Sequence, residues 1–346
     1  MVKAAEMECL IVGYCMQNLE QFRSGKPGSY PEQSIYAAYA CAEFGLAFAD
    51  IDGGTGLVFS VSSATRSIHF GAGRCSWYPQ NSATASTLAS DKYFAGRILA
   101  QAGVATLGGD YFFLHDRHRA HRPAGHERED ALAHFRKLGG PAFVKPLAGS
   151  RGDFAQIVQD EPALVRYLGE VAHYYDAVLM QPVVTGNEYR VFLLDDDVLF
   201  TARKHPPSLT GDGIGSIRDL LTAHNHALRS RGLSPVSVDR DATLDVVLAQ
   251  GQRWEIPGRM NLSAGGIMVL EAPASGAVPA LARKAARALG LRVAAIDLFA
   301  DIGGDADAIQ VIEVNSNPSI RLLEQSGRDD LILKIWHHTF STMGLL

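Results

Sequence analysis

The sequence has few cysteines and no long apolar run. Among its 346 residues there are four cysteines, none in a Cys-x-x-Cys pair, which argues against a disulfide framework and a cysteine-bound zinc ion. We expect reduced thiols that lie mostly in the core. No apolar run approaches the roughly 20 residues that a membrane-spanning helix needs, and the first residues lack the pattern of a secretory leader. These absences favour a cytoplasmic protein without a membrane partner.

An excess of positive charge is also missing. The chain has 32 Lys and Arg residues against 37 Asp and Glu, which gives a net charge of −5 and a pI of about 6.2. This balance argues against a nucleic-acid partner, although it is compatible with a local basic pocket. Hydrophobic residues make up 47% of the chain, enough for a full core. The length allows about two domains, or one domain with several lobes.

The chain does contain alternating strand and helix patterns, which predict an α/β (α+β) fold. Over the first 80 residues, apolar runs at 8–14, 46–50 and 56–60 predict strands around a helix at 31–45. Asp91 can cap a helix at 92–102. Strands are predicted further on at 142–146, 155–158, 177–181, 188–194 and 198–203, and helices at 161–172, 217–229 and 280–289.

Two apolar segments near the C-terminus carry acids where buried strands usually carry Val or Ile. Glu313 and Asn315 are two residues apart, so a strand turns both to one face and Val314 to the core. Asp297 lies in a second apolar segment that can pair beside the first. Two carboxylates and an amide oxygen suit Mg²⁺ or Mn²⁺. The alternative is that the acids are structural and paired with basic residues, which only a distant Arg can provide.

Three further segments carry polar groups that can serve a phosphate-bearing substrate. Lys145 ends a strand before a loop with two glycines, which fits a phosphate site but also an ordinary hairpin. In a strand, Glu188 and Arg190 point to the same face. Glu188 is then a candidate to bind a ribose hydroxyl, and the alternative is that the two residues form an ordinary surface ion pair. Arg259 and Asn261 precede a flexible turn and suit a transferring phosphoryl group. A segment rich in His, Arg and Glu at 115–130 has no fixed apolar face, and we interpret it as a solvated loop or helix rather than a metal site.

In their order along the chain these motifs resemble the ATP-grasp superfamily, and within it the ATP-grasp module of cyanophycin synthetase. Glutathione synthetase, the ribosomal-protein glutamate ligase and D-alanine–D-alanine ligase are similar at a greater distance. The resemblance spans residues 90–321 and rests on Ser-Asp-Lys92, Phe-Val-Lys145-Pro-Leu, Gly-Asn-Glu188-Tyr-Arg190-Val, Thr210-Gly-Asp-Gly-Ile-Gly, Asn261-Leu-Ser-Ala-Gly-Gly, Ala-Ile-Asp297 and Ile-Glu313-Val-Asn315-Ser-Asn-Pro-Ser-Ile-Arg321. It implies two α/β subdomains that clamp ATP, preceded by a small α/β N-terminal domain.

The resemblance also implies residue roles. ATP would be held by Lys92, Lys145, Gly149, Ser150, Gly152, Gln181, Val183, Val184, Glu188, Arg190 and Lys204. Two Mg²⁺ (or Mn²⁺) ions would be held by Asp297, Glu313 and Asn315. Catalysis would involve Arg259, Arg203 and Asn261, and substrate binding would involve Arg321 and Ser319. The implied division is an N-terminal domain with a linker helix at 1–104, a lid at 105–185 and a metal-binding subdomain at 186–346.

Two positions depart from the family pattern. Phe154 stands where the phosphate loop usually has another Gly, and Pro182 stands where the adenine connector usually has an acid. Pro keeps its carbonyl, so recognition of adenine by the backbone can survive. The first 80 residues match no family pattern.

The function that the resemblance implies is an ATP-dependent carboxylate–amine ligase. Such an enzyme forms an amide or peptide bond between amino acids or small peptides through an acyl phosphate, and it releases ADP and phosphate. The alternatives are a small-molecule kinase on the same fold and an ATP-binding regulatory protein without turnover. The oligomeric state stays open, a homodimer included.

Overall fold

The computed structural model describes residues 18–71, 77–149, 152–230, 235–236, 238, 242–256 and 266–346. Its contacts divide the chain into two compact units, Met1–Gln80 with Ser319–Leu346, and Asn81–Pro318. The predicted strand at 8–14 and three of the cysteines lie outside the described residues. No helix in the described part of the chain is long and apolar enough to cross a membrane.

The first unit is built from an N-terminal and a C-terminal segment of the chain. Its antiparallel sheet has the order β1 (Ala47–Asp50), β2 (Val58–Ser62), β3 (Ser67–Gly71). Its helices are α1 (Leu19–Arg23), α2 (Glu32–Phe44), α9 (Arg321–Gln325) and α10 (Asp329–Thr342), and α10 packs against α2. Buried aromatic rings of Phe59, Phe70, Trp336 and Phe340 form its core. Thus residues 319–346 pack with the N-terminal segment, although the division implied by the sequence motifs assigned them to the metal-binding part.

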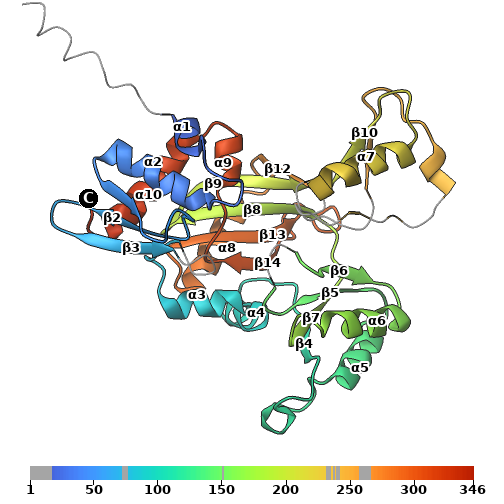
Figure 1. The fold of residues 1–346 in the computed structure, drawn as a ribbon. Coiled ribbons are helices and arrows are strands. Elements are labelled where there is room, and N and C mark those ends of the chain that lie inside the picture. Colours follow the sequence, from blue (N-terminus) through green and yellow to red (C-terminus); the bar gives the residue numbers. More distant parts are fainter. Residues whose placement is uncertain are drawn as a thin grey trace, which may run out of the picture. The chain divides into compact units, whose positions relative to one another are not determined.

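The second unit contains a five-stranded antiparallel sheet (Figure 1), which carries most of the candidate site. Its order is β12 (Ile267–Leu270), β9 (Asp197–His205), β8 (Asn187–Leu194), β13 (Val293–Ala300), β14 (Gln310–Asn315). Helices α3 (Ala83–Ser90), α4 (Lys92–Gln101) and α8 (Ala277–Leu289) bury one face, and their apolar residues form one core with alternate residues of the strands. Because strand side chains alternate, the polar residues of β8, β13 and β14 are left for the opposite face.

The same unit contains a four-stranded antiparallel sheet of order β4 (Asp110–Phe113), β7 (Ala177–Pro182), β5 (Ala142–Pro146), β6 (Gln156–Val158). The short helix η1 (Arg119–His121) and the helices α5 (Arg128–Leu138) and α6 (Glu161–Val171) accompany it. The two longer helices and the inward-facing strand residues make a separate core, which includes Val144, Leu168 and Met180. The other face of β5 and β7 carries Lys145 and Gln181.

A small projection follows β9 (Figure 1). It consists of β10 (Ser208–Thr210), α7 (Ile217–Ser230), η2 (Ala242–Asp245) and β11 (Arg253–Glu255), and β10 pairs with β11. Its core is small and contains Leu209, Ile217, Leu228 and Leu248.

The predicted α/β class is confirmed, and most predicted elements are present. Helix α4 begins where its cap was predicted, since the Asp91 carboxylate accepts from the backbone N–H groups of Tyr93 and Phe94 at 3.0 Å. The strands predicted at 188–194 and 198–203 are present as β8 and β9, which form a hairpin whose turn includes Asp195 with a positive φ of 51°. The strand predicted at 56–60 is displaced by two residues, to Val58–Ser62.

Candidate active site

The three predicted metal ligands lie on two adjacent strands of the five-stranded sheet. In the register of β13 and β14, Asp297 is opposite Glu313, and Ala295 is opposite Asn315. Val314 is buried in the core on the helix-covered face. Glu313 and Asn315 therefore share the other face with Asp297, as the two-residue period of a strand predicts.

Asp297 has a close basic partner on the neighbouring strand β8. Arg190 Nε donates to Oδ1 and Arg190 Nη2 donates to Oδ2 of Asp297, both at 2.7 Å. The side chains are 19% and 6% exposed. Burial alone would raise the pKa of the Asp297 carboxyl, but the charge and hydrogen bonds of Arg190 outweigh it and hold this pKa below its usual range. Arg190 is thus the distant basic partner that the alternative of a structural, paired acid required. With this partner, Asp297 stays ionised.

Asn315 is oriented by the same carboxylate. Its Nδ2 donates to Asp297 Oδ2 at 3.2 Å, which turns the Asn315 amide oxygen away from Asp297. Oδ2 thus accepts from Asn315 and Arg190, whereas Oδ1 accepts from Arg190 alone. A carboxylate oxygen has two lone pairs, so Asp297 Oδ1 keeps one for another partner.

This donor set fits a hard divalent cation. Asp297 Oδ1, the Asn315 amide oxygen and the Glu313 carboxylate are all oxygen ligands, which Mg²⁺ and Mn²⁺ prefer. No cluster of three or more His, Cys, Asp or Glu side chains with metal-binding geometry occurs in the described part of the chain. With two carboxylates and one amide, the residues resemble a site that relies on substrate oxygens for its remaining ligands.

Glu313 faces the buried Lys145 and the half-buried Lys92. Burial lowers the pKa of Lys145, which is 6% exposed, and the Glu313 charge is the strongest influence that opposes this shift. Burial also lowers the pKa of Lys92, and the negative charge of Glu313 opposes this shift as well. Lys92 Nζ donates to the backbone carbonyls of Leu147 at 3.4 Å and Gly149 at 2.5 Å. The three side chains form a mixed-charge cluster drawn from α4, β5 and β14.

Glu188 and Lys204 extend the polar face onto β8 and β9. They are cross-strand partners, and Lys204 Nζ donates to Glu188 Oε1 at 2.5 Å. Burial raises the pKa of the Glu188 carboxyl, against the opposing charge of Lys204. Arg203 is the next residue on β9 and points to the other face, where its guanidinium donates to Asn187 and Glu271. The structure therefore brings Lys204 to the metal-site face and does not bring Arg203 there.

The predicted adenine connector leaves β7 beside a cavity. Gln181 is 4% exposed, and its Nε2 donates to the carbonyl of Gly108 at 2.8 Å. Val183 and Val184 follow with exposed and half-buried side chains. A cavity of about 170 Å³ is lined by Gln181 and by residues that include Lys92, Tyr93, Leu179 and Glu313. Its walls come from segments far apart in the sequence, so periodicity along the chain gave no sign of it.

The predicted phosphate loop follows β5, and its glycines Gly149 and Gly152 are among the described residues. A Cβ on Gly149 would lie 2.9 Å from the Pro146 side chain, and Gly152 has a φ of 71°, so both positions favour glycine. Phe154 also has a positive φ, 54°, where the family usually has Gly. Its ring stacks on Tyr174 with centroids 5.1 Å apart. Packing therefore compensates a backbone conformation that costs a side-chain-bearing residue roughly 1–2 kcal/mol.

Some predicted site residues cannot be placed with the others. Ser150, Arg259 and Asn261 lie outside the described residues. Ser319 and Arg321 belong to the first unit, where the Ser319 hydroxyl accepts from the backbone N–H of Arg321 at 3.3 Å. There Arg321 forms an ion pair of 2.9 Å with Glu32.

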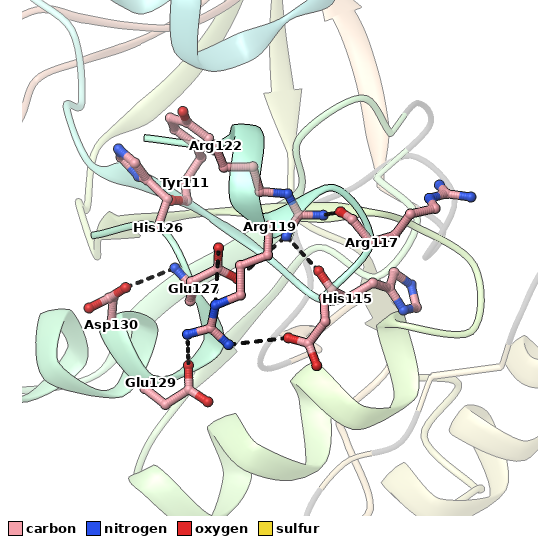
Figure 2. A network of polar contacts seen from close by, with 10 residues as sticks. Tyr111, His115, Arg117, Arg119, Arg122, His126, Glu127, Glu129 and Asp130 are labelled. Atoms are coloured by element: carbon pink, nitrogen blue, oxygen red, sulfur yellow. Dashed lines mark hydrogen bonds and ion pairs between the residues drawn. The ribbon is translucent and has the colours of Figure 1, made fainter. Parts of the chain in front are cut away.

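The segment rich in His, Arg and Glu forms a polar network at one end of the four-stranded sheet (Figure 2). Arg122 lies over the Phe113 ring at 3.9 Å and donates to the His115 carbonyl at 2.5 Å. His126 stacks on Tyr111 with centroids 4.1 Å apart. These contacts tie the loop between β4 and α5 to its own strand, which agrees with the structural interpretation of this segment.

The chain is similar in sequence to curated proteins. No protein-family model matches it. It is 28% identical to the cyanophycin synthetase of Geminocystis herdmanii over 257 residues, which are 68% of this chain and 28% of that protein. It is 26% identical to the glutathione biosynthesis bifunctional protein GshAB of Desulfotalea psychrophila over 257 residues, 67% of this chain and 31% of that protein. The chain thus spans less than a third of the length of these curated relatives.

Solved structures match a larger part of the chain. A bifunctional glutathione synthetase from Pasteurella multocida superposes with a TM-score of 0.54 at 19% identity, over 88% of this chain and 44% of that one. The D-alanine–D-alanine ligase from Bacillus anthracis gives a TM-score of 0.50 at 16% identity, over 76% and 71%. The chain therefore shares the fold of these two ligases. The predicted fold is thereby confirmed, whereas the roles of single residues stay predictions.

Proposed function

We propose that this chain is an ATP-dependent carboxylate–amine ligase that joins amino acids or short peptides. One observation carries the proposal. On an ATP-grasp fold, one sheet face presents Asp297, Glu313 and Asn315 close to the half-buried Lys92 and the buried Lys145. Oxygen ligands beside fixed ammonium groups suit a nucleoside triphosphate with its divalent cation. Cyanophycin synthetase, the glutathione protein and D-alanine–D-alanine ligase, to which the chain is similar, support a ligase.

In this proposal the described residues mainly bind and orient the nucleotide. Lys92 and Lys145 place positive charge against the phosphates. Glu188 offers Oε2 to a ribose hydroxyl, because its Oε1 is already held by Lys204. The backbone of the connector after Gln181 recognises the adenine edge, while the loop from Gly149 to Gly152 covers the phosphates. Positioning of this kind is the main protein contribution to phosphoryl transfer.

Asp297, Glu313 and Asn315 would hold Mg²⁺ or Mn²⁺, with two ions expected. When bound, the metal would neutralise charge on the phosphate oxygens. The chain's own contribution is to keep the Asp297 carboxylate ionised through Arg190 and to hold the Asn315 amide beside Asp297 by the hydrogen bond from Nδ2.

The remaining roles concern the acid and the amine. The substrate carboxylate takes the γ-phosphoryl group, and the amine then attacks the acyl phosphate, so the products are an amide, ADP and phosphate. Arg259 and Asn261 are proposed to stabilise charge at the reacting phosphoryl, and Arg321 with Ser319 to bind a substrate carboxylate. Residues 105–185 are proposed as the lid, preceded in the sequence by an N-terminal part, 1–104, and followed by a metal-binding part from residue 186 on, whose last residues, 319–346, pack with the N-terminal segment. We expect the protein to work in the cytoplasm on small molecules, without nucleic acid, alone or as a homodimer.

A screen for ADP release tests this function. The protein is mixed with Mg²⁺ and ATP and with amino acids, singly and in pairs. We expect little ADP without the correct carboxylate, some with it alone, and most with the amine present. Hydroxylamine in place of the amine should trap a hydroxamate. AMP and pyrophosphate would overturn the acyl phosphate route, and a stable phosphorylated product without an amine requirement would identify a kinase instead.

A further inference from the structure

Arg190 and Asp297 form a charge pair at a place where Asp297 is proposed to hold a metal ion. We propose that Arg190 is a positioning residue that weakens metal binding by Asp297 until the nucleotide supplies negative charge, so that Mg²⁺ or Mn²⁺ binds together with ATP rather than before it. This inference rests on the proposed function above.

The first step is the geometry of the pair. Both guanidinium donors are 2.7 Å from the two oxygens of the carboxylate. With Asn315 bound to Oδ2 as well, only Oδ1 of Asp297 has a lone pair to offer. A paired arrangement of this kind is geometrically specific, so Arg190 fixes the orientation of the carboxylate, and the bond from Asn315 leaves Oδ1 as the oxygen that can reach a cation. It also places a positive charge next to that cation.

The second step is the charge of the whole face. Within the described residues, the sheet face carries the carboxylates of Glu188, Asp297 and Glu313 and the cations Arg190 and Lys204, and Lys92 and Lys145 act on it from α4 and β5. The charge of Asp91 acts on Lys92 in turn. Four negative charges against four positive charges leave no net negative charge to attract a lone divalent cation. The phosphates of a nucleotide add negative charge and oxygen ligands of their own.

The two neighbouring ion pairs do not play the same part. Lys204 pairs with Glu188 at the far side of β8, whereas Arg190 pairs with a proposed metal ligand itself. Arg190 is therefore the cation whose removal should most directly free a ligand. If Arg190 limits metal binding, a neutral residue of similar shape at this position should produce a gain of binding. Loss of a purely structural contact would not produce one.

The experiment measures Mn²⁺ binding by the full chain from the electron paramagnetic resonance signal of free Mn²⁺. It compares the unchanged protein with R190Q and R190K, with and without a non-hydrolysable ATP analogue. Without the analogue, R190Q should bind Mn²⁺ at least about tenfold more tightly, because a unit charge near the ion counts for more than a decade of affinity even at an effective dielectric constant of 20. R190K keeps the charge and should stay within about threefold of the unchanged protein.

R292Q is the matched control. Arg292 also binds an aspartate through two donors, to Asp195 at 2.7 and 3.1 Å, but both side chains are exposed. R292Q changes the net charge of the protein by the same amount, and solvent screens its effect. Its affinity for Mn²⁺ should equal that of the unchanged protein.

R190Q leaves a buried carboxylate without its partner and can lower stability. For that reason the melting temperature is also measured with and without Mn²⁺. A ligand that binds the folded state raises the melting temperature, and it does so more when it binds more tightly. The increase caused by Mn²⁺ alone should be larger in R190Q than in the unchanged protein. Equal affinities, or a gain in R190K as large as in R190Q, would overturn the role of Arg190 while leaving the proposed function intact. If no protein bound Mn²⁺ even with the analogue, the proposed metal site would fail together with this inference.

Discussion

The ammonium group of Lys92 donates to the carbonyl of Gly149 at 2.5 Å and so links the start of α4 to the loop after β5. Lys92 also reaches the Leu147 carbonyl at 3.4 Å, and burial lowers its pKa. A half-buried lysine is stabilised by such acceptors. In the proposed enzyme the same ammonium would contact the phosphates, so the loop and the nucleotide compete for one cation.

Replacement of Lys92 by Met should therefore affect both partners. We expect nucleotide affinity to fall by about tenfold or more, since a charge-assisted contact to phosphate is lost. Amide hydrogen exchange at residues 147–149 should become faster, because the loop loses an anchor. Lys137→Met, on an exposed position of α5, is the control and should change neither. Unchanged nucleotide affinity in Lys92→Met would remove Lys92 from the proposed site.

Glu313 offers the simplest test of the metal assignment. In the described residues no hydrogen bond or ion pair within 4 Å holds its carboxylate, although Lys92 and Lys145 feel its charge. Glu313→Gln should thus fold normally and lower turnover by about 10²-fold or more, comparable to the loss of one transition-state electrostatic contact. Glu43→Gln, exposed on α2, is the control. A fully active, Mg²⁺-dependent Glu313→Gln protein would show that Glu313 is not a ligand.

Phe154 allows the strain in the loop to be measured. At its φ of 54°, Ala carries the same steric cost as Phe, whereas Gly carries none. Both substitutions lose the stacking on Tyr174. We expect Phe154→Gly and Phe154→Ala both to be less stable than the unchanged protein, with Gly more stable than Ala by about 1 kcal/mol. Denaturant unfolding measures this order, and the opposite order would mean that the positive φ is absent in solution.

The part of the site that could be predicted from sequence is the part set by local spacing. The period of a strand placed Glu313 and Asn315 on one face and Val314 in the core. The two glycines after Lys145 likewise marked the end of a strand, and Asp91 indicated a helix start.

Contacts between distant segments could not be read in this way. Arg190 and Asp297 are 107 positions apart, and only the pairing of β8 with β13 brings them together. Arg203 and Lys204 look equivalent in sequence, yet adjacent strand residues point to opposite faces, and the choice of face is made by the core beneath the sheet. The same reason explains why residues 319–346 were placed with the metal-binding part, because the packing of α10 on α2 leaves no local signal.

Lys145 gives a prediction about stability and pH. Its ammonium is buried at the end of β5, and burial is the main reason that its pKa lies below the usual value of 10.5. A lysine whose pKa is lower in the folded state penalises folding at every pH where the unfolded chain holds the proton more tightly. The penalty is complete below the folded pKa and disappears as pH rises toward 10.5. Lys145→Met keeps the stem and removes the charge, so it should be more stable than the unchanged protein at neutral pH.

The gain in stability of Lys145→Met over the unchanged protein should shrink as the pH is raised. At high pH Lys145 is neutral, so both the variant and the unchanged protein fold without a buried charge. Nucleotide affinity should fall by about tenfold or more, since a phosphate-binding charge is lost. Stability gained at the expense of binding is typical of a functional position. Denaturant unfolding at several pH values, with Lys137→Met as control, measures the first effect, and titration with ATP measures the second. A variant that is less stable at neutral pH would show that the Glu313 charge outweighs the cost of burying Lys145.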